Sequence, residues 1–267
     1  FGAALGPMAL APHLWIDATY VKARDGGRIV SRAVIVAVGV NTDGRREALG
    51  VAAELSEAEP FWTDFLRSLA DRGPRGVKLV VADDHKGLRA ASSRVFGAAQ
   101  QRCRVHWTQG ALSRAPAKQR PAVAALLKTV FVETGKSAAL EPWEAVSERL
   151  RQKHGRIAEL MDVARDDVPA SMDFPQPHSA QIHSTNPLER LTREIKRPSD
   201  VVGVFPNDDA IIRPVGALML EQNDEWTASA LQGISSTIAG PALAVVHPAW
   251  FCGEAAAGHD GFRGSAA

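Results

Sequence analysis

Hydrophobic and polar positions change their period several times along the chain, and each change predicts an element. Residues 14–20 form a short apolar run that is typical of a strand, and the glycine pair at 26–27 predicts a hairpin turn into a second strand over 29–40. A turn over 41–44 then leads to a third strand over 45–55. The chain is therefore predicted to begin with a three-stranded meander.

The pattern then alternates between helical and extended segments. Apolar residues recur at helical spacing over 61–69, and Gly and Pro residues at 73–76 end that helix. The apolar run 77–82 is typical of a short buried strand, and a helix is predicted over 87–96. Residues 102–107 are predicted to form one more short strand.

The second half of the chain is predicted to be mainly helical. An amphipathic helical pattern, broken by prolines, covers residues 111–168, and the Pro-rich segment 168–182 is predicted to be a connecting loop. Two further helices are predicted over 184–197 and 208–221, and the periodicity fades after residue 227.

This order of elements predicts an α/β fold that is interrupted by an all-helical segment. We expect residues 1–110 to form the first part of the core, 111–180 a helical insertion, and 181–228 the last part of the core. The remainder, 229–267, is rich in Gly, Ala and Ser, and we expect it to be a poorly ordered tail.

Composition limits the classes of protein that fit. The chain has 267 residues, of which 45% are hydrophobic and 23% charged, as in ordinary globular proteins. Lys and Arg number 31 against 30 Asp and Glu, a net charge of +1, which excludes a strongly basic DNA-coating protein. Contacts with DNA would therefore come from local patches or from a part of the protein not present in this chain.

Other features concern the compartment and the ends of the chain. Two cysteines exclude a disulfide framework and favour a reducing cytosol. The start lacks an initiator Met and a basic signal region, so we expect a fragment or a truncated copy. No run reaches the roughly 18 apolar residues of a transmembrane helix.

Two aspartates stand out by their strand context. Asp17 interrupts an apolar strand, where Asp is disfavoured, although an edge-strand Asp facing water is an alternative. Asp83 follows the buried strand 77–82, a common place for catalytic residues in α/β folds. Asp83 could instead be the N-cap of the next helix, and Asp84 could serve as that cap in its place.

Glu189 is the third candidate. Asn186 fits an N-cap and Pro187 fits the first helical position, so Glu189 would stand at the third position, where a Glu can cap its own helix. Leu188, Leu191 and Ile195 form an apolar stripe, and on another face Glu189 lies with Arg193 and Lys196. That face suits a metal ion beside a phosphate backbone, or else is a solvated face with an ion pair.

Three carboxylates from two strands and one helix could hold two divalent cations. Mg²⁺ prefers oxygen ligands, and two such ions can clamp the attacking and leaving oxygens of a phosphoryl transfer. Chemistry of this kind needs no Ser, Cys or His nucleophile.

Six segments then carry a resemblance to a known family. They are Trp15–Tyr20, Val80–Leu88, Cys103–His106, Ser184–Arg190, Val201–Asn207 and Leu220–Trp226. Each segment alone is a weak signal. Together and in this order they resemble the mutator-type bacterial insertion-sequence transposases, which are DDE transposases, over residues 14–226.

The resemblance implies an RNase H-like core, a mixed sheet flanked by helices, with an all-helical insertion between the second Asp and the Glu. It implies that Asp17, Asp83 and Glu189 are the catalytic residues and bind two Mg²⁺ (or Mn²⁺) ions. The intervals of 66 and 106 residues agree with this pattern. Asp84 stands where the family has a small residue, and it is a conceivable substitute ligand.

The resemblance also implies roles for neighbouring residues. His85, Cys103 and His106 are expected beside the carboxylates or near DNA, although Cys103 and His106 could be structural, and one Cys with one His does not make a usual four-ligand zinc site. Basic residues are expected to contact DNA phosphates, which positions DNA without reading its sequence. These are Lys22, Arg24, Lys86, Arg190, Arg193, Lys196 and Arg197.

The implied function is cleavage of DNA at the ends of an insertion sequence, followed by transfer of the new 3′ ends into target DNA. The implied partners are the terminal inverted repeats, target DNA and further copies of the chain, in the nucleoid of a bacterial cytoplasm and not at a membrane.

Three alternatives remain. The chain could be an inactive, truncated remnant that only binds DNA or a sibling transposase, because Pro198 is expected to end the Glu189 helix early and Pro214 falls within a helical pattern. It could be a stand-alone RNase H-like nuclease. An Asp-nucleophile phosphatase fits less well, because Asp17 lacks a second Asp two residues later.

Overall fold

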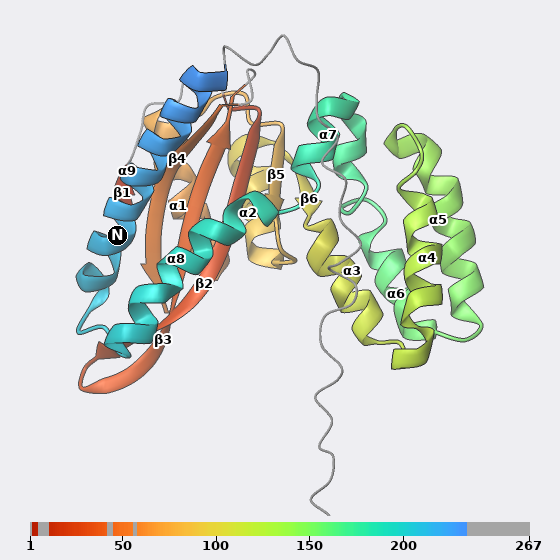
Figure 1. The fold of residues 1–267 in the computed structure, drawn as a ribbon, viewed down its shortest axis with the longest axis horizontal. Helices are drawn as coiled ribbons and strands as arrows, with labels where there is room; N and C mark the ends of the chain where they lie inside the picture. Colours follow the sequence, from red (N-terminus) through yellow and green to blue (C-terminus); the bar gives the residue numbers. More distant parts are fainter. Residues whose placement is uncertain (1, 5–10, 42–44, 56–57, 234–267) are drawn as a thin grey trace, which may run out of the picture. The chain divides into compact units, whose positions relative to one another are not determined.

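The computed structural model describes residues 2–4, 11–41, 45–55 and 58–233 (Figure 1). Residues Phe1–Ala230 form one compact unit, which contains the whole sheet. The predicted turn at 42–44 and most of the predicted tail, residues 234–267, lie outside the described residues. Within the described part, no helix is long and apolar enough to cross a membrane.

A six-stranded mixed sheet forms the centre of this unit, in the order β1-β4-β3-β2-β5-β6. Its strands β1 to β4 are antiparallel, whereas β2, β5 and β6 run parallel to one another. Gly26 and Gly27 both have positive φ, which is the backbone that a two-residue hairpin turn between β2 and β3 requires. The strands are β1 (Gly2–Ala4), β2 (His13–Asp25), β3 (Arg28–Val40), β4 (Arg46–Glu54), β5 (Leu79–Ala82) and β6 (Ala99–Arg102).

Helices make up the rest of the unit. Short 3-10 turns lie at Ala117–Gln119 (η1) and Ala170–Asp173 (η2). The α-helices are α1 (Glu59–Arg72), α2 (Lys86–Phe96), α3 (Arg104–Ser113), α4 (Arg120–Val130), α5 (Lys136–Arg151), α6 (Gly155–Ala164), α7 (Gln176–Ile182), α8 (Asn186–Val202) and α9 (Asp208–Gly233).

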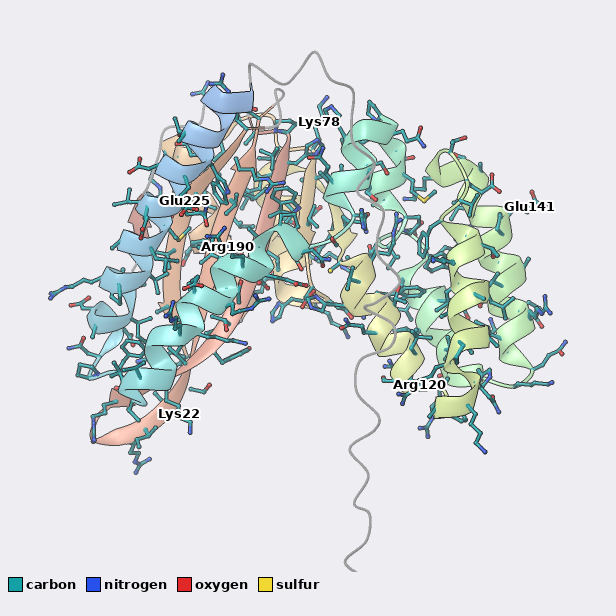
Figure 2. The ribbon with its side chains drawn as sticks, in the orientation of Figure 1. Lys22, Lys78, Arg120, Glu141, Arg190 and Glu225 are labelled. Atoms are coloured by element: carbon teal, nitrogen blue, oxygen red, sulfur yellow. The ribbon has the colours of Figure 1, made fainter. Side chains whose placement is uncertain are left out.

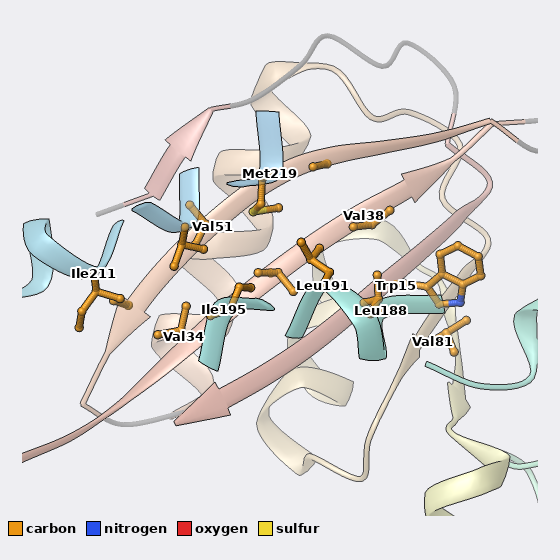
Figure 3. Close-up of a cluster of buried hydrophobic side chains, with 14 of the residues drawn as sticks. Trp15, Val34, Val38, Val51, Val81, Leu188, Leu191, Ile195, Ile211 and Met219 are labelled. Carbon is orange, nitrogen blue, oxygen red and sulfur yellow. The ribbon is translucent and has the colours of Figure 1, made fainter. Parts of the chain in front are cut away.

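Alternation along the strands places a separate hydrophobic layer on each face of the sheet. Trp15 and Val81 belong to the layer that includes residues of α8 and α9 (Figure 3). Their neighbours Ile16 and Val80 belong to the opposite layer, which includes residues of α1 and α2. Helices therefore cover both faces of the sheet, and the α/β prediction is confirmed in this form. Asp17 has the same parity as Trp15, so its side chain is on the α8 side.

A third hydrophobic cluster belongs to the helical block formed by α3 to α6 and η2. Trp107 stacks on Trp143 with ring centroids 5.1 Å apart, and the Trp143 indole N–H donates to the Met161 carbonyl at 3.1 Å. The buried indole is therefore both packed and hydrogen bonded, as a Trp in an interior requires. This block has a core of its own, separate from the two layers on the sheet.

Two predicted elements were wrong. Residues 102–107 are not a strand, since β6 ends at Arg102 and α3 begins at Arg104. The strand itself escaped detection because Gln101 is fully buried yet polar. Its amide donates to the Val168 carbonyl at 2.7 Å, and its oxygen accepts from the Ser171 N–H at 2.6 Å. These long-range bonds satisfy a polar group that no local pattern would assign to a core.

The segment 168–182 is also not a simple loop, because it contains η2 and α7. Proline stands in the first turn of α7, where a missing N–H costs nothing and the fixed φ favours a helix. The prolines that indicated a loop in the sequence therefore mark the start of a helix.

Proline also does not end α8 or α9. Helix α8 continues past position 198 to Val202, and α9 contains Pro214 and runs to Gly233, beyond the predicted end at residue 221. The chain after α8 is fixed to β2, because the Phe205 N–H donates to the Lys22 carbonyl and the Arg24 N–H donates to the Phe205 carbonyl, both at 2.8 Å. In α9, buried Ile211, Val215 and Met219 on either side of Pro214 pack on the sheet.

Burial of Leu191 predicts a large effect on stability. Its side chain lies buried between α8 and the sheet, so Leu191→Ala is expected to lower the free energy of unfolding by about 2–5 kcal/mol through lost transfer energy and a cavity. Val201 on the same helix is 85% exposed, and Val201→Ala is expected to change it by less than about 0.5 kcal/mol. Urea unfolding of both variants measures the difference, and equal losses would contradict this packing.

Candidate active site

Parallel pairing places Asp17, Asp83 and Cys103 level with one another. In the β2–β5 register His13 pairs with Leu79 and Trp15 with Val81, an offset of 66 residues that extends to Asp17 and Asp83. In the β5–β6 register Ala82 pairs with Arg102, an offset of 20 that extends to Asp83 and Cys103. The Cys103 N–H also donates to the Ala82 carbonyl at 2.8 Å. The three residues thus form one row across neighbouring strands, which we call the acidic row.

Asp17 is the most buried carboxylate of the row. Its oxygens accept from the Ala18 N–H at 3.0 Å and from the Thr192 hydroxyl on α8 at 2.6 Å. Burial raises the pKa of Asp17, and the charge of Asp83 raises it further, against the opposing effect of the Thr192 hydrogen bond. Asp17 and Asp83 are therefore close enough to repel each other, a situation that a bound cation would relieve.

Asp83 is exposed and bonds to His106. One carboxylate oxygen lies 2.6 Å from His106 Nδ1. This hydrogen bond to Asp83, together with a bond to Cys103, raises the pKa of His106 to about 11, so the imidazole is a cation at neutral pH. His106 therefore holds one oxygen of Asp83 and compensates part of the negative charge of the row.

Cys103 is fully buried at the start of α3. Its sulfur accepts from both the N–H and the hydroxyl of Thr185, each at 3.4 Å. Burial opposes ionisation of the thiol, but hydrogen bonds from His106 and Thr185 outweigh it and lower the pKa of Cys103. The sulfur thus joins the residue before α8 to the end of the acidic row.

Helix α8 passes over the row from Cys103 to Asp17. Thr185 contacts Cys103 at one end, and Thr192 contacts Asp17 at the other. Seven residues of helix span about 10.5 Å, close to the ~9.6 Å of two strand spacings. Glu189 lies between them in sequence on the same helical face, since spacings of four and three residues keep one face. This spacing predicts that Glu189 stands on the part of α8 nearest the middle of the row, beside Asp83.

The capping interpretation of Glu189 is not supported. Helix α8 begins at Asn186 itself, which had been taken as the N-cap, so Glu189 is the fourth helical residue and not the third. A capping carboxylate would accept a hydrogen bond from the Thr185 N–H, but this N–H donates to the Cys103 sulfur instead. Glu189 is exposed, and among the described residues no hydrogen-bond partner for it is found. Its carboxylate is thus available at the site.

The capping interpretation of Asp83 is also wrong. His85 is the N-cap of α2, and its Nδ1 accepts from the Leu88 N–H at 3.3 Å. His85 was expected to orient Asp83 or to contact a phosphate, and this stays a prediction, because the capping bond of its Nδ1 does not test it. The side chain that bonds to Asp83 is His106.

Asp84 is engaged elsewhere. Arg89 donates to one of its oxygens at 3.2 Å, and Arg102 to the other at 3.0 Å. Arg89 also pairs with Asp167 at 2.5 Å. Two guanidinium groups therefore neutralise Asp84, which disfavours it as a substitute metal ligand.

The basic residues expected to contact phosphates are all exposed, but they are not equally placed. Lys22 and Arg24 lie on β2 and Lys86 at the start of α2, while Arg190, Arg193, Lys196 and Arg197 lie on α8. Arg190 is labelled on α8 in Figure 2. Arg190 stands 3.8 Å from Glu225, and Arg197 stands 3.6 Å from Glu194, so both have carboxylate neighbours already.

Sequence reasoning missed two residues of this site, Thr185 and Thr192. The signal that could have found them is their helical spacing from Glu189, four residues before and three after. Threonines at such positions are common on solvated faces, so the spacing alone does not indicate a functional site. It becomes informative only once the acidic row is known to lie beneath α8.

Donor chemistry at the site fits a divalent cation. Asp17, Asp83 and Glu189 offer hard oxygen ligands of the kind Mg²⁺ and Mn²⁺ prefer. Within the described residues, ligand atoms of Asp83, Cys103 and His106 also lie within 4.8 Å of one another, a softer set that would suit zinc. Thr185 already donates twice to the sulfur and His106 already bonds to Asp83, which favours the carboxylates as the cation ligands.

Comparison with known proteins agrees with these motifs. Residues 8–229 match the family model described as "Transposase, Mutator family". The chain is 39% identical over 223 residues to the transposase for insertion sequence element IS1081 of Mycobacterium tuberculosis, covering 82% of this chain and 54% of that protein. It is 39% identical over 222 residues to the transposase for IS406 of Burkholderia multivorans, covering 82% and 57%.

A third relative is the transposase for IS256 in transposon Tn4001 of Staphylococcus aureus, 30% identical over 227 residues, which are 84% of this chain and 58% of that protein. The chain thus spans about half the length of the curated relatives it matches. Among solved structures, a chain of the simian T-cell lymphotropic virus intasome in complex with PP2A regulatory subunit B56 gamma matches 45% of this chain and 49% of that chain. It is 12% identical with a TM-score of 0.24, too low to establish a shared fold.

The hydrogen bond between Thr192 and Asp17 predicts a pH-dependent effect. Because the hydroxyl stabilises the charged carboxylate, Thr192→Val is expected to raise the pKa of Asp17 further and to weaken Mg²⁺ binding about tenfold at mildly acidic pH. The acidic limb of a pH profile of Mg²⁺ affinity, measured calorimetrically, should move to higher pH. Thr192→Ser retains the hydroxyl and should restore the profile. A Val variant with an unchanged profile would refute the role of Thr192.

Proposed function

Because the chain belongs to the Mutator family of transposases, we propose that it carries the catalytic core of a transposase that cuts DNA at the ends of an insertion sequence and joins them to target DNA. The observation that carries this proposal is the acidic row. Two aspartates stand level on adjacent parallel strands, and a glutamate lies on the helix that crosses them. A mixed sheet of this topology with α8 beside β2 supports an RNase H-like core.

Asp17, Asp83 and Glu189 are the proposed catalytic residues and would hold two Mg²⁺ or Mn²⁺ ions. Mutual repulsion of Asp17 and Asp83 supports this assignment, because both carboxylates lose that penalty when a divalent cation stands between them. Bound ions of this kind stabilise the charge on the attacking and leaving oxygens of a phosphoryl transfer. Both cleavage and strand transfer are reactions of that class.

The surrounding residues position these carboxylates. His106 holds one oxygen of Asp83, which leaves the other oxygen to turn toward Asp17. Thr192 fixes the oxygen of Asp17 that faces α8. Preorganised ligands of this kind lower the cost of assembling a charged site at the moment of reaction. Thr185 ties the start of α8 to Cys103 and so fixes the level at which Glu189 stands.

Exposed cations would bind the DNA backbone around this site. Lys22, Arg24 and Lys86 lie on the elements that carry Asp17 and follow Asp83, and the basic residues of α8 extend beyond Glu189. Phosphate contacts of this type fix the register of DNA without reading bases. We therefore assign recognition of the sequence of the terminal inverted repeats to residues other than these.

The division of the chain is part of the proposal. Residues 1–110 and 181–228 would form the two parts of the core and 111–180 the helical insertion, followed by a tail over 229–267. The separate hydrophobic cluster of the helical block, which runs from Trp107 to Met172, supports such an insertion. The active form would be a complex of several copies with both element ends, within the nucleoid of a bacterial cytoplasm.

The test is DNA cleavage that depends on the three carboxylates. A supercoiled plasmid that carries the DNA from both sides of the gene is incubated with the protein and Mg²⁺. The positions of nicks and of joined ends are then mapped. Asp17→Asn, Asp83→Asn and Glu189→Gln are each expected to reduce the rate at least about 100-fold, since each removes a ligand charge. Glu194→Gln, on the same helix but paired with Arg197, is the matched control and should retain activity.

Metal binding provides an independent reading of the same variants. Saturating Mg²⁺ at about 100 times its Kd should stabilise the wild type and the Glu194 variant by about 2.7 kcal/mol, and the three carboxylate variants much less. Metal stabilisation without any DNA cleavage would indicate an inactive remnant. This conclusion requires that cleavage also stays absent when the part of a relative that this chain does not match is joined to it. Equal stabilisation of all five proteins would contradict the proposed ligands.

A further inference from the structure

A cluster of basic residues lies on the helical block, away from the carboxylates of the acidic row. A cavity of about 300 Å³ is bounded by the end of α3 with η1 on one side and by the turn from α5 into α6 on the other. Its lining contains three Arg or Lys residues and one His, but no Asp or Glu. The lining residues are Arg114, Pro116, Gln119, Lys153, His154, Gly155, Arg156 and Ile157.

The cations of this cavity lack carboxylate partners. Arg114, Lys153 and Arg156 are exposed, and in the described ranges 11–41, 45–55 and 58–233 none of them forms an ion pair. Elsewhere on the same block, Arg151 pairs with Asp162 at 2.8 Å and Arg165 with Glu144 at 2.6 Å. The block thus compensates Arg151 and Arg165 and leaves the arginines of the cavity without a counter-charge.

Further positive charge surrounds the cavity. Lys118 belongs to η1 and Arg120 begins α4, and both side chains are exposed. Arg120 marks this end of the helical block in Figure 2. The Arg120 Nε donates to the Ala115 carbonyl at 3.2 Å, a bond that leaves its charge uncompensated. An open surface that carries basic but no acidic lining residues attracts a polyanion.

Helix α3 links this cavity to the candidate active site. It carries His106, which bonds to Asp83, and it ends before Arg114, which lines the cavity. Eight residues of helix correspond to about 12 Å of rise and about 80° of rotation. A separation of about 12 Å lies within the reach of a few nucleotides of one DNA strand. One rigid helix therefore sets a fixed separation between the two sites that fits a single DNA backbone.

We propose that this cavity binds the phosphate backbone of duplex DNA a few nucleotides from the phosphate at the carboxylates. The proposal rests on the proposed function, since it requires DNA at the acidic row. Three long, exposed cations converging from two segments suit a backbone that crosses the surface, because each can reach a different phosphate oxygen. The site would hold the duplex in register with the row and would not read sequence.

The test measures DNA affinity against salt concentration in EDTA, where no cleavage occurs. A triple variant, Arg114→Gln with Lys153→Gln and Arg156→Gln, is compared with wild type on a duplex oligonucleotide. Loss of three phosphate contacts is expected to reduce the slope of log K against log salt by about 2.7, and the affinity on the order of 100-fold in 0.1 M salt.

The matched control removes three exposed cations from other surfaces, as Arg67→Gln with Arg75→Gln and Lys128→Gln, which lie on α1, before β5 and on α4. Its slope should stay within about 0.5 of wild type. Equal slopes for the two triple variants would overturn the proposal and leave the proposed function standing. Wild type that binds no duplex DNA would instead count against the proposed function itself, and tighter binding of duplex RNA of the same sequence would overturn the choice of ligand.

A second measurement needs no variant. Lys153 of the wild type is acetylated with a small reagent, with and without duplex DNA, and Lys128 serves as the internal reference on the same block. DNA is expected to slow acetylation of Lys153 several-fold while Lys128 reacts at the same rate. If both lysines react equally fast in the presence of bound DNA, the backbone does not occupy the cavity.

Discussion

Register between parallel strands is the constraint on which the candidate site depends. The offset of 66 residues between β2 and β5 brings Asp17 level with Asp83, and the offset of 20 between β5 and β6 brings Cys103 beside them. A slip of one residue in β2 would turn every side chain to the other face. Asp17 would then enter the layer of α1 and α2, and Ile16 would face α8. The assignment of alternate β2 residues to the two hydrophobic layers therefore fixes the position of Asp17 as well as the packing of the core.

The packing of α8 is the second constraint, and hydrophobic burial sets it. Leu188, Leu191 and Ile195 fix the rotation of the helix about its axis, because each buries a full side chain against the sheet. Burying such side chains contributes about 1.5–3 kcal/mol apiece, more than the roughly 1 kcal/mol of an ordinary hydrogen bond. Contacts of Thr185 and Thr192 with the row follow from that rotation. The apolar stripe thus determines which face, and which carboxylate, meets the strands.

The sequence pattern predicted those elements whose buried residues are apolar and regularly spaced. Strands β3, β4 and β5 were predicted within two residues at each end, whereas β2 and α8 were predicted but run five residues past their expected ends at 20 and 197. Strand β6 was not predicted, because its buried residues Gln100 and Gln101 are polar. Gln101 is tolerated there only because Val168 and Ser171, distant in sequence, satisfy its amide. Interactions of this type become visible only when the tertiary structure is known.

The pair Asp83 and Asp84 shows the same limit at the site. Two adjacent aspartates after a strand are equivalent in local chemistry, and the sequence motif alone kept Asp84 as a substitute. Their environments separate them, because Asp84 lies between Arg89 and Arg102 whereas Asp83 bonds to a single imidazole. A carboxylate bound by two guanidinium groups would have to break both pairs to bind a cation, whereas Asp83 keeps an oxygen outside its His106 contact. Surrounding charge, and not position in the motif, distinguishes the proposed ligand Asp83 from its neighbour Asp84.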